Sequence, residues 1–142
     1  MKIVKTKFSE LDESQLKRLQ KMTIQDSSFL RYLHDYIDNP QSEVDRTIYL
    51  ALDSDIVGWT LVGIDEDFGF GEEGMIHLFV DSAMRGEGLG LKLFENAVEE
   101  IKSTGIKSIL TYAHDKSSQA FFNSDKVKEI CAKNNIKIEI IS

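Results

Sequence analysis

The residues with the clearest capacity for chemistry are Arg85-Gly86-Glu87-Gly88-Leu89-Gly90, which connect an apolar segment to a long helical pattern. Glycines at alternate positions let a backbone turn tightly and approach a ligand closely. The first N–H groups of a helix have no partner within the helix, and the helix dipole places partial positive charge there. Such N–H groups bind phosphate or diphosphate, and Arg85 adds a cation beside them. A strand-to-helix turn that binds nothing is the alternative that these residues leave open.

Two well-known phosphate-binding patterns do not fit this segment. A Walker A loop ends in Gly-Lys-Ser or Gly-Lys-Thr, whereas Leu91-Lys92 follows Gly90 here. A GxGxxG dinucleotide fingerprint fits Gly86 and Gly88, but Leu91 stands in the place of its third glycine. The segment therefore predicts a phosphate site of another kind.

The run LFVDSAMRGEGLG, from Leu78 to Gly90, resembles the acyl-CoA signature of the GNAT N-acetyltransferase superfamily. That signature is a strand reading L-x-V, a short turn, then Arg or Gln-x-x-Gly-x-Gly or Ala, and a long helix. Arg85, Gly88 and Gly90 occupy its fixed places. The resemblance implies an acetyl-CoA-dependent N-acetyltransferase. It would transfer an acetyl group directly to an amine on a small molecule or a protein.

The resemblance also implies how the co-substrate acetyl-CoA is bound. Backbone N–H groups from Arg85 to Leu91 would hold its diphosphate. The edge from Leu78 to Val80 would pair with the pantetheine arm, and a free N–H there would stabilise the oxyanion. The cofactor-binding residues implied in this way are Leu78, Phe79, Val80, Arg85, Gly86, Glu87, Gly88, Leu89, Gly90, Leu91 and Ser117.

The group that would remove a proton from the amine departs from the family's pattern. Many members carry Glu or His on the signature strand, facing the substrate, whereas Gly74 and Ile76 stand at the matching positions here. The candidate catalytic residues are Glu73, next to that strand, and His114, which follows the next strand. A solvated surface side chain is the alternative for each. His77 has the opposite parity on its strand, so we expect it to serve packing or to be partly exposed.

The acid that would protonate the leaving thiolate is also missing from its usual place. Many members carry a tyrosine after a pattern like Asn-x-x-Ala-x-x-Phe-Tyr. The segment from Ser117 to Ser124 matches only at Ser117 and Ala120. Ser124, or Phe122 under a shifted alignment, falls where tyrosine would stand, and neither can act as a phenolic acid. Tyr112, within a predicted strand, is a further candidate that we expect to be packing. A catalytically degenerate GNAT-like module that binds acyl-CoA or a protein is therefore the alternative function.

Hydrophobic periodicity predicts the elements that position these residues. Strands are expected at Lys2–Phe8, Thr47–Leu52, Ile56–Ile64, Met75–Val80, Ser108–Ala113 and Lys137–Ile141. Helices are expected from a Ser9 cap to Lys21, over Ser27–Ile37, over Gly88–Thr104 and over Ser117–Asn134. The order β-α-α-β-β-β-α-β-α-β argues for a mixed sheet with helices on its faces. This order also resembles that of the GNAT family from Lys2 to about Ala120, and the resemblance implies an α/β (α+β) fold with a mostly antiparallel central sheet and helices on both faces. We expect a single domain over residues 1–142.

Two of these helices carry apolar side chains at helical spacing. In the first, Leu16 and Leu19 should face inward, and Asp12 stands at the acidic position of a capping box. In the third, Gly105 should end the helix. Its predicted buried stripe is Phe94, Ala97, Val98 and Ile101.

Composition excludes several other classes. The 142 residues are 42% hydrophobic and 29% charged, which is a globular balance, and the formal net charge is −7. An acidic surface disfavours nucleic acid and anionic lipid, so neither nucleic acid nor a membrane is an expected partner, although an acidic mimic of nucleic acid stays open.

Histidine and cysteine spacing predicts no metal site. The single cysteine, Cys131, favours a small buried thiol and a reducing, cytoplasmic setting. The last strand can pair between two copies, so a homodimer stays open.

Overall fold

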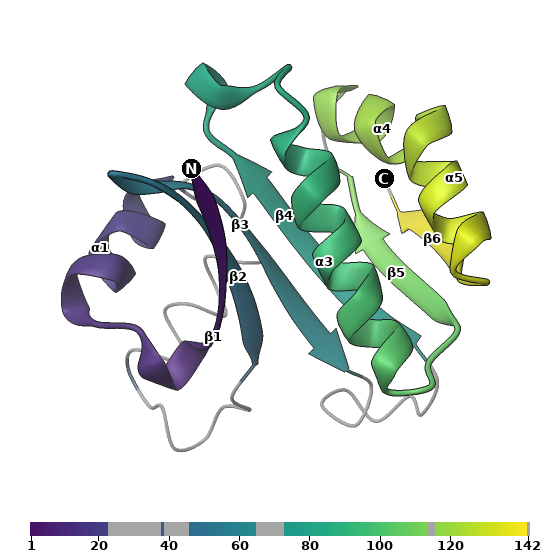
Figure 1. Ribbon diagram of the computed structural model, residues 1–142, viewed down its shortest axis with the longest axis horizontal. Helices are drawn as coiled ribbons and strands as arrows, with labels where there is room; N and C mark the ends of the chain where they lie inside the picture. Colours follow the sequence, from purple (N-terminus) through teal and green to yellow (C-terminus); the bar gives the residue numbers. More distant parts are fainter. Residues whose placement is uncertain (23–37, 39–45, 65–72, 114–115, 142) are drawn as a thin grey trace.

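In the part of the chain that the structure describes, six strands form one open sheet in the order β1-β2-β3-β4-β5-β6 (Figure 1). The computed structural model describes residues 1–22, 38, 46–64, 73–113 and 116–141. Its strands are β1 (Lys2–Lys7), β2 (Thr47–Asp53), β3 (Asp55–Ile64), β4 (Glu73–Val80), β5 (Ser108–Tyr112) and β6 (Lys137–Ile141). Its helices are α1 (Glu13–Met22), α3 (Leu89–Ser103), α4 (Lys116–Phe122) and α5 (Asp125–Lys133), with short 3-10 turns η1 (Phe8–Glu10) and η3 (Ser82–Met84).

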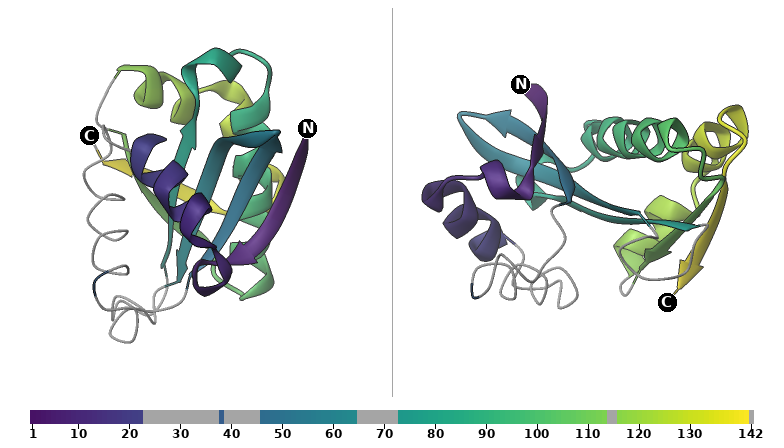
Figure 2. Two further views of the ribbon diagram at one scale, coloured as in Figure 1. Left: turned by 90° about the vertical axis from the view of Figure 1, so that its left-hand side faces the viewer. Right: turned by 90° about the horizontal axis from the view of Figure 1, so that it is seen from below.

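The sheet is mixed and mostly antiparallel, as predicted. Each neighbouring pair from β1 to β4 is antiparallel, whereas β5 pairs in parallel with both β4 and β6. The turn between β2 and β3 lies at Asp53-Ser54-Asp55, between the two strands predicted at Thr47–Leu52 and Ile56–Ile64, and Ser54 adopts a positive φ of 66° there. Helices lie on both faces, with α3 and α5 on one side of the sheet and α1 on the other (Figure 2).

Helix α3 buries the predicted apolar stripe against the sheet. Phe94, Ala97, Val98 and Ile101 are all fully buried. Helix and sheet approach closely because β4 carries a glycine under α3. A Cβ built at Gly74 would lie 2.7 Å from Cδ1 of Ile101. Gly105, with a φ of 85°, follows the end of the helix as predicted.

Helix α1 covers the opposite face through Leu19, which is fully buried, and Leu16, which packs beside it. The predicted Ser9 cap is wrong, because Ser9 lies in η1 and Asp12 is the N-cap. The Asp12 carboxylate accepts from the N–H of Gln15 at 2.8 Å, and the Gln15 side chain accepts from the N–H of Asp12 at 3.0 Å. These reciprocal bonds form a capping box that starts the helix three residues later than expected.

Three other expectations need correction or lie outside the description. The single helix predicted over Ser117–Asn134 is two helices, because Ser124 adopts an extended φ/ψ and its hydroxyl accepts from the N–H of Val127 as the N-cap of α5. Strand β4 begins at Glu73, two residues before its predicted start. The helix predicted over Ser27–Ile37 lies outside the described residues.

A partly buried polar cluster joins β1 and β2 to α3. The Glu100 carboxylate accepts from Lys5 Nζ at 2.8 Å and from the Tyr49 hydroxyl at 3.1 Å. Burial raises the pKa of Glu100, but the hydrogen bonds from Lys5 and Tyr49 and the charges of Lys5 and Lys7 outweigh it, so the net pKa is lowered. Burial, together with the Glu100 charge, raises the pKa of Tyr49. Both shifts favour a charged Glu100 and a neutral Tyr49 near pH 7.

The cluster predicts an acid-dependent loss of stability. The pKa of Glu100 lies below its ordinary value of 4.5, so its stabilisation is present above that value and is lost as the pH falls through the lowered folded pKa. Glu100→Gln should therefore lower the free energy of unfolding by about 1–2 kcal/mol at pH 7. Urea unfolding should show this difference shrinking below pH 4.5.

Glu95→Gln is the matched control, because Glu95 is an exposed carboxylate on the same helix. Its unfolding free energy should follow that of the unaltered protein at each pH. A Glu100→Gln difference that stays constant down to pH 3 would contradict the role given to the cluster.

Candidate functional site

Strands β4 and β5 form a fork, because they pair over only part of the length of β4. Their parallel register runs from Glu73 with Ser108 to Ile76 with Thr111 and goes no further. Beyond it, β4 stays with β3, where Trp59 pairs with Phe79. Strand β5 stays with β6, and the tips of β4 and β5 lie apart (Figure 1). The last half of β4 therefore has no ladder partner on its β5 side among the described residues.

Two side-chain hydrogen bonds establish which way the backbone of β4 faces. The carbonyl of Ile76 points toward β5, since it accepts from the Thr111 hydroxyl at 2.9 Å. The carbonyl of His77 points toward β3, since it accepts from the Thr60 hydroxyl at 3.0 Å. Backbone polar groups alternate direction along a strand. The N–H and C=O of Leu78, and those of Val80, consequently face the fork.

The turn between β4 and α3 has the conformation that its glycines predict. Gly86 and Gly88 have φ values of 86° and 80°, in the left-handed region that favours glycine. Gly88 is the N-cap of α3 and has no side chain to cap the first helical N–H groups. Gly90 serves close packing, because a Cβ there would lie 3.1 Å from the Phe121 ring. The first turn of α3 is therefore held against α4 with its backbone N–H groups open toward the turn.

A cavity of about 520 Å³ extends from this turn into the fork. Every residue predicted to bind the co-substrate lines it except Glu87. These lining residues are Leu78, Phe79, Val80, Arg85, Gly86, Gly88, Leu89, Gly90, Leu91 and Ser117. The sequence did not nominate the other lining residues as co-substrate ligands. They are His77, Met84, Tyr112, Ser118, Phe121, Phe122, Ser124 and Lys126.

The predicted catalytic residues do not meet at this cavity in the described structure. Glu73 opens β4 opposite Ser108 and lies four residues, or roughly 13 Å, before His77. It is not among the described lining residues. His114 lies outside the described residues. The roles of Glu73 and His114 stay predictions.

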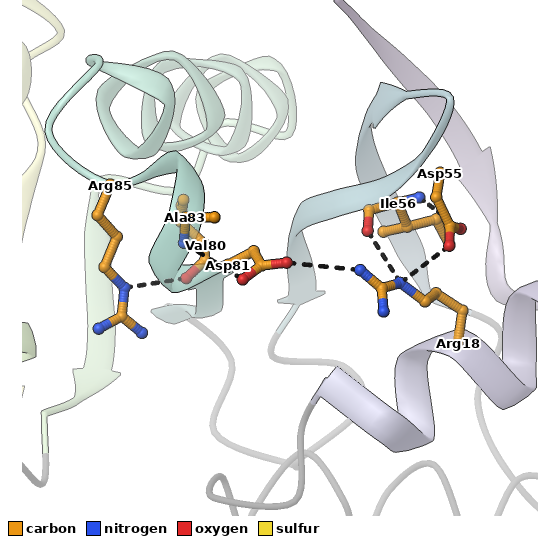
Figure 3. A network of polar contacts seen from close by, with 7 residues as sticks. All are labelled: Arg18, Asp55, Ile56, Val80, Asp81, Ala83 and Arg85. Atoms are coloured by element: carbon orange, nitrogen blue, oxygen red, sulfur yellow. Dashed lines mark hydrogen bonds and ion pairs between the residues drawn. The ribbon is translucent and has the colours of Figure 1, made fainter.

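Side chains also hold the turn between β4 and α3 in place. One of them comes from α1, and sequence reasoning missed its contact. Arg85 Nε donates to the Val80 carbonyl at 3.0 Å, with its guanidinium 5.9 Å from the centre of the Phe79 ring. Arg18, on α1, reaches the Asp81 carboxylate at 3.5 Å (Figure 3). Its Nε also lies 3.1 Å from the Ile56 carbonyl and contacts Asp55. These bonds join α1, β3 and the turn.

The remaining reactive groups belong to the core or the surface. Cys131 is buried, and burial raises its pKa, so its thiol stays protonated and packs as a small apolar group. Among the described residues, no His, Cys, Asp or Glu side chains gather in a group that could hold a metal ion. In the same part of the chain, no helix is long and apolar enough to cross a membrane.

A glycine-built helix N-terminus beside two diverging central strands defines a class of protein, the acetyltransferases of GNAT type. The chain belongs to this family, because the acetyltransferase (GNAT) family matches residues 10–124. The resemblance read from the signature is thus confirmed, and N-acetyl transfer is the family's class of activity.

Solved structures agree with this assignment at the level of the fold. The Trypanosoma brucei acetyltransferase is 21% identical, covers 85% of this chain and 89% of its own, and has a TM-score of 0.57. The ribosomal-protein-alanine N-acetyltransferase of Brucella melitensis biovar Abortus 2308 is 12% identical, and the match covers 86% of this chain and 88% of that protein, also with a TM-score of 0.57. A mutant AtaT toxin, bound to the C-terminus of the antitoxin AtaR and to acetyl-CoA, is 14% identical over 86% and 81%, with a TM-score of 0.55. A search of curated proteins found no match.

The contact between Arg18 and Asp81 predicts a local change in the dynamics of the turn. Arg18→Met keeps an unbranched side chain but removes the ion pairs with Asp81 and Asp55 and the bond to Ile56. A half-exposed ion pair is worth about 0.2–1 kcal/mol. The Met84 amide, which donates to the Asp81 carbonyl at 2.8 Å, should therefore exchange its hydrogen about 1.4- to fivefold faster.

The Ala113 amide is an internal reference, because it donates to the Ile141 carbonyl at the far side of the fork. Its exchange rate should not change in Arg18→Met. Equal acceleration at Met84 and Ala113 would indicate a global loss of stability instead of a loosened turn.

Proposed function

We propose that this protein is an acetyl-CoA-dependent N-acetyltransferase that transfers an acetyl group directly to an amine. The observation that carries the proposal is the exposed backbone edge of Leu78 and Val80, next to the open N-terminus of α3. One end of the cavity suits an anion and the other offers a strand edge. Coenzyme A has the matching parts, a diphosphate joined to an arm that contains amides.

The cavity has the size and lining that such a ligand needs. A volume of about 520 Å³ lies within the usual range of about 300–1,000 Å³ for small-molecule sites. The N–H groups from Gly86 to Leu91 and the positive end of the α3 dipole would hold the diphosphate. The amides of the arm would pair with Leu78 and with the N–H of Val80 as a short added strand, since the Val80 carbonyl already accepts from Arg85 Nε. Leu89 and Leu91 supply apolar walls.

In the fork, the thioester carbonyl would lie next to a backbone N–H group that stabilises the negative charge developing on its oxygen. The N–H of Leu78 points into the fork, and a donor aimed at a developing oxyanion is typically worth about 3–4 kcal/mol. A lysine-like amine has a pKa of about 10.4, so its neutral form lies about 4.6 kcal/mol uphill at pH 7. A base near the fork is therefore needed, unless the acceptor amine is neutral in solution.

The acceptor is an amine on a small molecule or a protein, and one domain over residues 1–142 would suffice for the reaction. A net charge of −7 favours the approach of a cationic amine. The buried free thiol of Cys131 fits a reducing, cytoplasmic setting. An edge-to-edge homodimer through β6 is compatible with these roles, because β6 is the last strand of the described sheet.

A second function, binding of acyl-CoA without turnover, is favoured by one observation. Ser124 stands where the family's tyrosine is expected, and its hydroxyl serves as the N-cap of α5, 3.4 Å from the N–H of Val127. A serine in that use is no substitute for a phenolic acid. Release of free coenzyme A from acetyl-CoA, in the presence of a panel of amines, distinguishes the enzyme from the binding module.

The proposed site predicts that a bulky side chain at Gly88 abolishes co-substrate binding. Gly88→Trp would fill the space beside the first N–H groups of α3, which a diphosphate must reach. Isothermal titration calorimetry should show a loss of affinity for acetyl-CoA of at least about 100-fold, the equivalent of several lost charge-assisted hydrogen bonds.

Gly105→Trp is the matched control at the other end of α3. Gly88 and Gly105 have φ values of 80° and 85°, and a Cβ at either position meets nothing within 4 Å. The two variants therefore carry the same backbone strain, but only one blocks the cavity. Absence of binding by the unaltered protein at millimolar acetyl-CoA, or equal losses in both variants, would contradict the proposed site.

A further inference from the structure

The titratable side chains that line the described cavity fall into two groups, one outside the strands of the fork and one on them. Among the described lining residues these are His77, Arg85, Tyr112 and Lys126. Arg85 lies in the glycine turn and Lys126 in the first turn of α5, and both are cations near pH 7. His77 and Tyr112 lie on the two strands of the fork. Proton transfer at the fork by a described lining residue therefore falls to His77 and Tyr112.

The register of β4 and β5 brings these two residues to the same level. The last pair joins Ile76 to Thr111, so the next residues along the two parallel strands are His77 and Tyr112. Paired strands lie about 4.8 Å apart, and the divergence beyond Ile76 widens that spacing. His77 and Tyr112 thus stand opposite each other where the fork opens.

Strand parity places both side chains on the same face of the sheet. Ile76 on β4, and Ile109 and Ala113 on β5, are buried in the cluster beneath α3. Because side chains alternate along a strand, His77 and Tyr112 project to the other face. Both still line the cavity, whose remaining walls include Leu89 and Leu91 of α3. The cavity therefore passes through the fork, from the α3 side to the face that carries His77 and Tyr112.

We propose that His77 and Tyr112 are the catalytic base and acid of the acetyl transfer, an inference that rests on the proposed function. The amine nitrogen forms a bond to the thioester carbon, and the bond from that carbon to sulfur breaks, with its electron pair moving to sulfur. His77 accepts a proton from the amine nitrogen, and the Tyr112 hydroxyl gives a proton to sulfur. The products are the acetylated amine and the free thiol.

His77 suits the role of base and Tyr112 the role of acid, whereas the opposite assignment does not suit their chemistry. An ordinary imidazole has a pKa of about 6.5 and an ordinary phenol one of about 10, so near pH 7 the first is mostly neutral and the second is protonated. After transfer, His77 holds an extra proton and Tyr112 lacks one. A proton passed from His77 to Tyr112, directly or through one water, restores both. Tyr112 would thus replace the tyrosine that Ser124 cannot supply.

The test measures coenzyme A release from acetyl-CoA with n-butylamine as acceptor, a lysine-like alkyl amine that is mostly protonated near pH 7.5 and therefore needs a base before it can attack. Tyr112→Phe and His77→Gln should each lower kcat about 100-fold or more, the usual contribution of a positioned acid or base. The dissociation constant for coenzyme A should stay within about threefold in both variants. The double variant should lose little more than either single one, because the two groups act in the same step.

Tyr49→Phe is the matched control, because the Tyr49 hydroxyl bonds Glu100 and does not line the cavity. Its kcat should equal that of the unaltered protein. Thermal unfolding and coenzyme A affinity establish that each variant is folded. A folded Tyr112→Phe or His77→Gln that keeps kcat within threefold would overturn the proposal while leaving the transferase intact. An unaltered protein that binds acetyl-CoA but releases no thiol with any amine would overturn both and leave the binding module.

Discussion

The site depends on the point at which β4 and β5 cease to pair. The Thr111 hydroxyl holds the Ile76 carbonyl, and from the next residue each strand keeps its other neighbour only. On one side, the Thr60 hydroxyl holds the His77 carbonyl, while on the other the Ala113 N–H bonds the Ile141 carbonyl. Had the ladder continued, the N–H of Leu78 would be used within the sheet. Unpairing thus turns structural hydrogen-bonding groups into groups that can bind a ligand.

Helix α3 connects the glycine turn to the β4 side of the fork. It packs on β2, β3 and β4, and glycines on two of these strands let it approach closely. A Cβ at Gly58 would lie 3.2 Å from a Leu93 methyl group, and one at Gly74 would clash with Ile101. These two close contacts, near Leu93 and near the end of the helix, set the spacing between α3 and the sheet. The first N–H groups of α3 therefore stay at a set distance from the exposed edge of Leu78 and Val80.

The features that the sequence predicted are local ones. The buried stripe from Phe94 to Ile101 and the positive φ values of Gly86 and Gly88 follow from spacing and residue type within one segment. The fork could not be predicted, because Ile76 and Thr111 lie 35 residues apart and the apolar pattern continues on both strands. The parity expected for β4 was wrong, because Gly74 and Ile76, expected to face the substrate, lie against Ile101 and in the core beneath α3, whereas His77 lines the cavity. Arg18 gave no signal, since its contact with Asp81 spans 63 residues.

Net charge and local charge act on different scales in this molecule. A formal charge of −7 argues against anionic partners, yet the charged side chains that line the described cavity, Arg85 and Lys126, are both basic. The two statements agree because exposed charges are screened beyond about 8 Å at physiological ionic strength, whereas the α3 N-terminus and Arg85 act within a few ångströms. Arg85 and Lys126 supply the only full charges among the described lining residues near pH 7, and both are positive. An acidic exterior with a cationic cavity would therefore attract an amine to the surface and an acyl-bearing diphosphate to the interior.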